Sequence, residues 1–207
     1  MASVLNKELF SSALTKALAL VESEFDALNA LDAATGDGDH GTAIKSTLEA
    51  AVAAAAKPGS LAETLSNVAM DVMSATGGST SSLYGSFFMG MSSGVAGEEL
   101  TASQTAAAFA SGLDMLCTMT NAKVGDKTMM DAMIPAIESM KANADSATLA
   151  ELFDGAAKAA KDGAAKTSEY VAKFGRARNL GERSKGSCDA GATSLALIFQ
   201  AFADVAK

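Results

Sequence analysis

Apolar residues recur with the spacing of an amphipathic helix along nearly the whole chain, and this pattern breaks at clusters of Gly, Pro, Ser and Thr. No stretch shows the sustained alternation that is typical of a β-strand. We therefore expect an all-α, single-domain bundle over residues 1–207, with short connections and mostly antiparallel neighbours. The pattern predicts about eight helices, at Lys7–Leu31, Thr42–Ala56, Leu61–Ala75, Leu83–Val95, Thr101–Met119, Thr128–Ala144, Thr148–Lys173 and Gly191–Ala206.

Several of these helices begin at residues that cap helix N-termini. Ser60 precedes Leu61, and Glu63 follows three positions later, as in a capping box. Thr148 and Glu151 have the same spacing. These signals fix where the helices start, so the residues between them belong to loops, where binding groups usually lie on a rigid scaffold.

The amino-acid composition indicates which residues form the core and which classes of ligand the protein can bind. Hydrophobic residues make up 49% of the chain but aromatic residues only 5%, which favours closely packed helices with a core of Ala, Leu, Met and Val. The formal charge of −8 argues against a general nucleic-acid surface, which needs an excess of Lys and Arg. We therefore expect any bound phosphate to arrive with its own cation.

The chain also lacks the usual signs of export or membrane insertion. It has two cysteines, no basic and apolar leader, and its longest apolar run, residues 50–56, is too short to cross a bilayer. We expect a cytoplasmic protein that does not span a membrane.

The densest group of chemically active residues is the run from Asp32 to Gly41, which holds Asp32, Asp37, Asp39 and the only histidine, His40. Carboxylates are the preferred protein ligands of Mg²⁺, which is often shared with substrate phosphates. The run also spells G-x-G-x-x-G, but it follows helical sequence and carries two Asp, unlike a dinucleotide loop. Its spacing does not fit a calcium loop. A plain Asp/Gly turn stays open as an alternative, although it leaves Asp32 and His40 unexplained.

Three other loops carry groups suited to phosphate. Residues 76–83 form a small-residue loop that enters a helix, an arrangement that can bind an anion or simply form a flexible turn. Gly125-Asp-Lys-Thr128 adds a lysine and a hydroxyl. Residues 175–186 contain all three arginines of the protein, which favours phosphate binding over a solvated basic loop.

Four motifs in this order resemble the nucleotide-binding L subunit of dihydroxyacetone kinases, the DhaL family. They are Asp32 with Gly36-Asp-Gly-Asp-His-Gly41, Gly77-Gly-Ser-Thr-Ser-Ser-Leu-Tyr-Gly85, Gly125-Asp-Lys-Thr128, and the segment from Gly175-Arg-Ala through Leu180-Gly-Glu-Arg183 to Asp189-Ala-Gly-Ala-Thr193. The resemblance implies an up-and-down barrel of eight helices with a nucleotide at one rim.

The resemblance also implies roles for single residues. Asp32, Asp37 and Asp39 would bind two Mg²⁺ ions, and His40 and Arg176 would be catalytic. ADP or ATP would be bound by His40, Gly41, Thr42, Ala43, Gly78, Ser79, Thr80, Leu83, Gly125, Thr128, Arg176, Asp189, Ala190 and Gly191.

In the family this subunit supplies the phosphoryl group, while a separate K subunit holds the ketose, and the donor is either ATP or a phosphotransferase-system phosphocarrier. The chain departs from the family pattern at two places. Ser187 and Ala190 stand where the family usually has His and Pro, and Ser81-Ser82 stand where it usually has Gly-Pro. The first hypothesis is a phosphotransferase subunit for dihydroxyacetone or another small ketose. The alternative is a nucleotide-binding regulatory module without kinase turnover.

Overall fold

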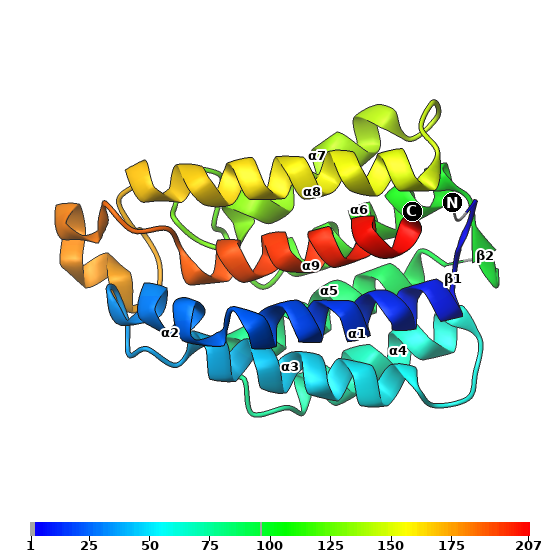
Figure 1. Cartoon of the computed structure of the whole chain (residues 1–207), viewed down its shortest axis with the longest axis horizontal. Helices are drawn as coiled ribbons and strands as arrows, with labels where there is room; N and C mark the ends of the chain where they lie inside the picture. The colour runs from blue at the N-terminus through cyan, green and yellow to red at the C-terminus, as the bar shows by residue number, and fades with distance from the viewer. Residues whose placement is uncertain (1–2, 96) are drawn as a thin grey trace.

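The computed structural model describes residues 3–95 and 97–207, and its elements are almost entirely helical (Figure 1). Within this part of the chain the α-helices are α1 Lys7–Ser23, α2 Phe25–Ala33, α3 His40–Ala55, α4 Leu61–Met73, α5 Ser79–Ser93, α6 Ala102–Cys117, α7 Met130–Asn143, α8 Leu149–Lys166 and α9 Ala190–Ala206. Two short 3₁₀ segments, η1 Thr167–Glu169 and η2 Arg176–Ser184, lie between α8 and α9. The prediction of an all-α fold is confirmed.

The helices close into a ring. Starting from α1, each long helix packs against the next one along the chain, through α3, α4, α5, α6, α7 and α8, and α9 packs back against α1. Successive helices run in opposite directions, so the loops gather at the two ends of the barrel (Figure 1). The chain termini lie at one end, and the α2–α3 and α8–α9 connections lie at the other.

The expected helix Lys7–Leu31 is in fact two helices, and this prediction was wrong in its detail. Glu24 leaves the helical conformation, with φ −104° and ψ 11°, and α2 begins directly after it. The beginning of α3 packs against α2, and the backbone N–H of Gly41 donates to Oδ1 of Asn29 at 2.7 Å. A Cβ on Gly41 would lie 2.7 Å from the carbonyl oxygen of Phe25, so glycine permits this close approach of α2 and α3.

Other boundaries also differ from the expectation. A two-residue antiparallel pair, β1 Leu5–Asn6 with β2 Glu99–Leu100, closes the end that carries the termini. Helix α5 begins at Ser79 rather than Leu83, and α8 ends at Lys166 rather than Lys173. The capping boxes of Ser60 with Glu63 and Thr148 with Glu151 are both present.

The middle of the barrel is aromatic, which the composition did not suggest. Ala, Leu and Met line the contacts between helices as expected. The centre, however, is a network of edge-to-face and stacked rings formed by Phe10, Phe87, Phe88, Phe109, Phe153, Phe199 and Phe202. Few aromatic residues suffice because they converge from five helices. None of the described helices is both long enough and apolar enough to cross a membrane.

Candidate functional site

A pocket of about 480 Å³ opens at the end of the barrel away from the chain termini. Four segments far apart in the sequence build it: the α2–α3 loop with the start of α3, the α4–α5 loop with the start of α5, residues 127–129, and residues 174–191. Each of the four motifs identified in the sequence contributes to its wall. The pocket therefore brings together residues separated by more than a hundred positions.

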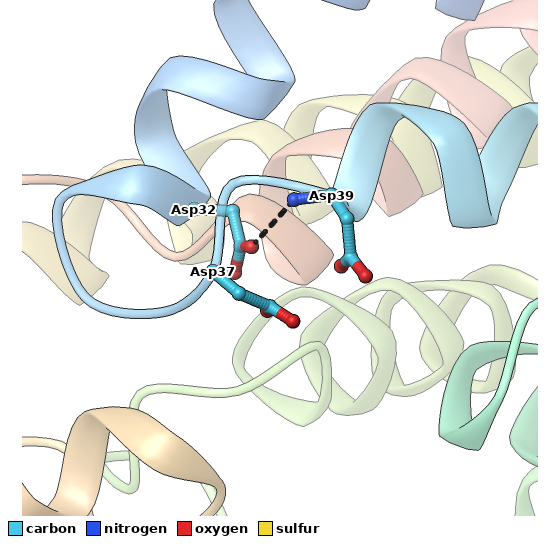
Figure 2. A group of neighbouring side chains, drawn as sticks. All are labelled: Asp32, Asp37 and Asp39. Atoms are coloured by element: carbon cyan, nitrogen blue, oxygen red, sulfur yellow. Dashed lines mark hydrogen bonds between the residues drawn. The ribbon is translucent and has the colours of Figure 1, made fainter.

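Three carboxylates converge on one side of the pocket (Figure 2). Asp32 lies in the last turn of α2, Asp37 in the loop, and Asp39 immediately before α3. One oxygen from each carboxylate lies within 4.8 Å of one from each of the others. Three negative charges at this separation repel one another strongly unless a cation lies between them. The oxygen donors and their spacing fit Mg²⁺.

The loop geometry forces this convergence. Oδ2 of Asp32 accepts hydrogen bonds from the backbone N–H groups of Gly38 at 2.8 Å and Asp39 at 3.1 Å, which fold the loop around this carboxylate (Figure 2). Gly38 has a positive φ of 77°, which favours glycine. A Cβ on Gly36 would lie 2.7 Å from Oδ1 of Asp32, so a side chain there would push that carboxylate away.

Arg176 reaches the carboxylates from the opposite wall. It begins η2, and its guanidinium forms an ion pair with the Asp37 carboxylate while remaining largely exposed. This contact joins the α8–α9 connection to the aspartate loop across the pocket. The other two arginines, Arg178 and Arg183, are exposed and do not line the pocket, so only one of the three meets the site.

The start of α5 offers unpaired backbone donors. Gly78 precedes the helix with a φ of 60°, and no side chain caps the first turn at Ser79 and Thr80. Free N–H groups at a helix N-terminus attract anions such as phosphate. Gly77 is held by a hydrogen bond from its N–H to Oγ of Ser81 at 3.0 Å, and a Cβ on Gly77 would lie 2.2 Å from that oxygen.

His40 and Asp189 form the inner wall, and both are perturbed by burial. Exclusion from water lowers the pKa of His40, partly offset by the nearby charge of Asp32. Burial raises the pKa of Asp189 to about 6, although its carboxylate also caps α9 by accepting from the N–H of Ala192 at 2.7 Å. Burial therefore shifts both groups of the inner wall toward their neutral forms.

Lys127 lines the pocket and hydrogen-bonds to two segments of the α8–α9 connection. It was not among the site residues expected from the sequence. It is 3% exposed, and its Nζ donates to the carbonyl oxygens of Thr167, at 2.6 Å, and Ser187. Its backbone has a φ of 59°, an uncommon conformation for a residue with a side chain. The motif Gly125-Asp-Lys-Thr128 signalled this lysine, but only the tertiary structure places its amino group between two segments of the α8–α9 connection.

We expect Lys127→Met to destabilise the protein by about 1 to 3 kcal/mol, because it leaves two carbonyl groups without their donor in a buried place. Urea denaturation followed by circular dichroism measures this change. Lys123→Met, at an exposed position four residues away, serves as the control and should leave the midpoint unchanged. A midpoint for Lys127→Met equal to that of the wild type would contradict the role given to this side chain.

The structure places most of the expected site residues around one pocket. Those that line it are Asp32, Asp37, Asp39, His40, Ala43, Gly78, Ser79, Thr80, Leu83, Thr128, Arg176, Asp189, Ala190 and Gly191. Three lie outside the lining. The N–H of Gly41 is engaged by Asn29, Thr42 is exposed, and the N–H of Gly125 donates to Oδ1 of Asp131 at 2.5 Å. Direct contact of these three with a nucleotide stays a prediction.

Comparison with known proteins gives consistent matches over this fold. Residues 34–204 match the family model described as the DAK2 domain. The chain is 33% identical to the ADP-binding subunit DhaL of PEP-dependent dihydroxyacetone kinase 2 from Listeria innocua, over 92% of this chain and 91% of that subunit. It is 37% identical to D-erythrulose kinase from Mycolicibacterium smegmatis, over 93% of this chain but only 34% of that enzyme.

A solved structure shares the architecture as well. The dihydroxyacetone kinase from C. freundii in complex with AMP-PNP and Mg²⁺ superimposes with a TM-score of 0.71 and 25% identity, covering 94% of this chain and 33% of that one. The chain therefore spans about a third of the longer kinases but nearly the full length of the Listeria subunit.

Proposed function

Because the chain belongs to the DAK2 domain family, we propose that it is the ADP- or ATP- and Mg-binding subunit of a kinase for dihydroxyacetone or a related small ketose. In this role it supplies the phosphoryl group to a ketose held on a separate K subunit. The observation that carries the proposal is that three convergent carboxylates and a helix N-terminus without a side-chain cap line the same pocket. Its relative from Listeria is named as an ADP-binding subunit, and the C. freundii kinase was solved with AMP-PNP and Mg²⁺.

Different residues would bind the metal and the phosphates of a metal nucleotide. Asp32, Asp37 and Asp39 would hold Mg²⁺, and the number of carboxylates is enough for two ions that share them. Bound Mg²⁺ would neutralise negative charge on the non-bridging phosphate oxygens. The N–H groups of Ser79 and Thr80 point from the start of α5, where they can donate to the phosphates. Phosphoryl transfer needs mainly such positioning and charge neutralisation.

We assign to Arg176 the stabilisation of the negative charge that develops on the phosphoryl group during transfer. Its guanidinium pairs with Asp37, and a cation held by the carboxylates would release the guanidinium to donate to a phosphate oxygen. The exposure of its side chain allows this movement without disturbing packing.

We expect Arg176→Ala to lower kcat by about 100-fold or more while changing nucleotide affinity much less, because a donor to transition-state charge is lost. The measurement is ketose phosphorylation after reconstitution with a K subunit, alongside calorimetry with Mg-ADP. Arg178→Ala is the matched control, since Arg178 lies two residues away and outside the pocket. Equal rates for the two variants would remove Arg176 from the mechanism.

The departure at Ser187 and Ala190 concerns positions where the backbone, and not the side chain, makes the contact that the structure shows. Ala190 is the first residue of α9, a position that favours proline but accepts most residues. Ser187 contributes its carbonyl oxygen to Lys127, and any residue type has that group. This favours the kinase subunit over the alternative, a regulatory module that binds a nucleotide without turnover.

The first experiment is to denature freshly purified protein, identify any released nucleotide by chromatography and quantify Mg in the same sample. Stoichiometric ADP and Mg support ADP as a resident cofactor, in keeping with the name of the Listeria relative as an ADP-binding subunit, and a phosphotransferase-system phosphocarrier would then recharge it. An empty protein that binds Mg-ATP reversibly supports an ATP-dependent kinase. Failure to bind either one overturns the proposal.

Turnover identifies the acceptor and the partner. Dihydroxyacetone and erythrulose, offered together with K subunits, test the ketose, since one relative is named for each substrate. If the protein binds a nucleotide but no K subunit gives turnover, the regulatory alternative is favoured.

We also propose that the protein is cytoplasmic. Its two cysteines, Cys117 and Cys188, are both free thiols in the structure, as is usual in a reducing compartment.

A further inference from the structure

One ring nitrogen of His40 is already engaged by a residue that no motif pointed to. Nε2 of His40 lies 2.8 Å from Oγ of Ser194, which is fully buried on α9. The two residues are separated by 154 positions, so only the closure of the barrel brings them together. Ser194 itself does not line the pocket, whereas His40 does.

The hydrogen bonds of Ser194 determine which nitrogen carries the proton. Oγ of Ser194 also lies 3.1 Å from the carbonyl oxygen of Gly191, and a carbonyl can only accept. A hydroxyl has a single proton, and both contacts are hydrogen bonds only if that proton goes to Gly191, because Nε2 of His40 can donate whereas the carbonyl cannot. Toward His40 the same oxygen must therefore accept, which requires a proton on Nε2 and leaves Nδ1 of the neutral ring as an acceptor.

We propose that Ser194 is a positioning residue that holds the His40 ring in the Nε2–H tautomer and in one orientation at the wall of the pocket. The hydrogen bond made by one ring nitrogen generally decides the state of the other. The only nitrogen that His40 can offer to a ligand is then Nδ1. The consequence for nucleotide binding rests on the proposed function, whereas the tautomer itself does not.

A second buried hydroxyl lies next to Ser194 without altering this assignment. Tyr84 on α5 is 3% exposed and lies beside Ser194, and its hydroxyl has no hydrogen-bond partner among the described residues. The serine oxygen has a second lone pair, which is enough to accept from Tyr84 as well if the two groups move closer. Ser194 would still accept from His40.

Because His40 is the only histidine, its imidazole signals in NMR spectra are unambiguous. The experiment records ¹⁵N shifts of the ring at about pH 8, above the ordinary histidine pKa, for the wild type, Ser194→Ala and Thr193→Val. Thr193 is the matched control, since its Oγ1 donates to the carbonyl of Asp189 at 2.7 Å and does not contact His40. Circular dichroism establishes that all three proteins are folded.

We expect a protonated Nε2 and an unprotonated Nδ1 in the wild type and in Thr193→Val, and a mixture of tautomers in Ser194→Ala. Affinity for Mg-ADP should fall by about 10-fold in Ser194→Ala, as is usual when the partner of a site residue is removed. A wild-type ring protonated on Nδ1, or signals or affinity unchanged by Ser194→Ala, would overturn the inference. If the wild type binds no Mg-ADP, the proposed function fails, and the NMR signals alone decide the role of Ser194.

Discussion

Asp37→Ala and Asp39→Ala proteins are expected to fold normally and to lose Mg-dependent nucleotide binding. Each change removes one of three convergent carboxylates. We expect affinity to fall by about 100-fold or more, equivalent to about 3 kcal/mol. The fold should survive because, within residues 3–95 and 97–207, the Asp37 side chain pairs only with the exposed Arg176, and the Asp39 side chain does not cap α3. Calorimetry with Mg-ADP and thermal unfolding on the same samples measure both effects.

The control for these variants is Asp26→Asn, an exposed acid in the first turn of α2, which should bind Mg-ADP like the wild type. Asp32→Ala is a less clean test, because its carboxylate also accepts from two N–H groups of the loop. Without metal, loss of one carboxylate relieves repulsion among the three, so the melting temperature should stay level or rise. Unchanged Mg-ADP affinity in Asp37→Ala and Asp39→Ala would remove the metal site.

Gly163→Ala is expected to destabilise the barrel by about 2 to 3 kcal/mol, because it overpacks a close contact between two helices. Gly163 on α8 lies against α7, and a Cβ there would be 2.0 Å from the carbonyl oxygen of Asp131. Backbone cannot rotate away as a side chain can, so the helices must separate. Urea denaturation gives the change in the free energy of unfolding.

The effect of Gly163→Ala should extend to the pocket. The Asp131 side chain accepts from the N–H groups of Gly125, at 2.5 Å, and Thr128, at 2.8 Å, so a shift of α7 displaces the loop that carries Lys127. Gly155→Ala on the same helix is the control, since its Cβ would meet only the movable hydroxyl of Ser139 at 3.1 Å. That change should stabilise the helix by up to about 1 kcal/mol. Equal destabilisation by both changes would contradict the close contact at Gly163.

The convergence of the three carboxylates could be predicted because these residues lie close together along the chain. Asp32, Asp37 and Asp39 fall within eight residues, so a loop alone brings them near one another, and the glycines between them indicate its tight path. The start of α5 was also visible as a run of small residues, although its first residue, Ser79, was placed four positions too late. A tight loop can be recognised in the sequence because only a few backbone conformations, and therefore only a few residue types, can form it.

In the basic segment, residues 175–186, the direction of the arginine side chains could not be predicted from the sequence. Three arginines within eight residues suggested a group that binds phosphate, yet only Arg176 faces the pocket. Residues 176–184 form 3₁₀ turns with a kink at Gly181, where φ is 54°, and these turns direct Arg178 and Arg183 to solvent. Composition gives the number of charges in a segment but not their direction.

The helical walls, their antiparallel order and the aspartate loop could be predicted from the residues alone, because amphipathic periodicity, capping residues and short-range spacing act over a few turns of chain. The break at Glu24, the aromatic centre, the buried Lys127 and the pairing of His40 with Ser194 could not be predicted in this way. Each of these depends on which helices become neighbours when the ring closes. Contacts between residues distant in sequence leave no periodic pattern, so their partners become evident only in the folded barrel.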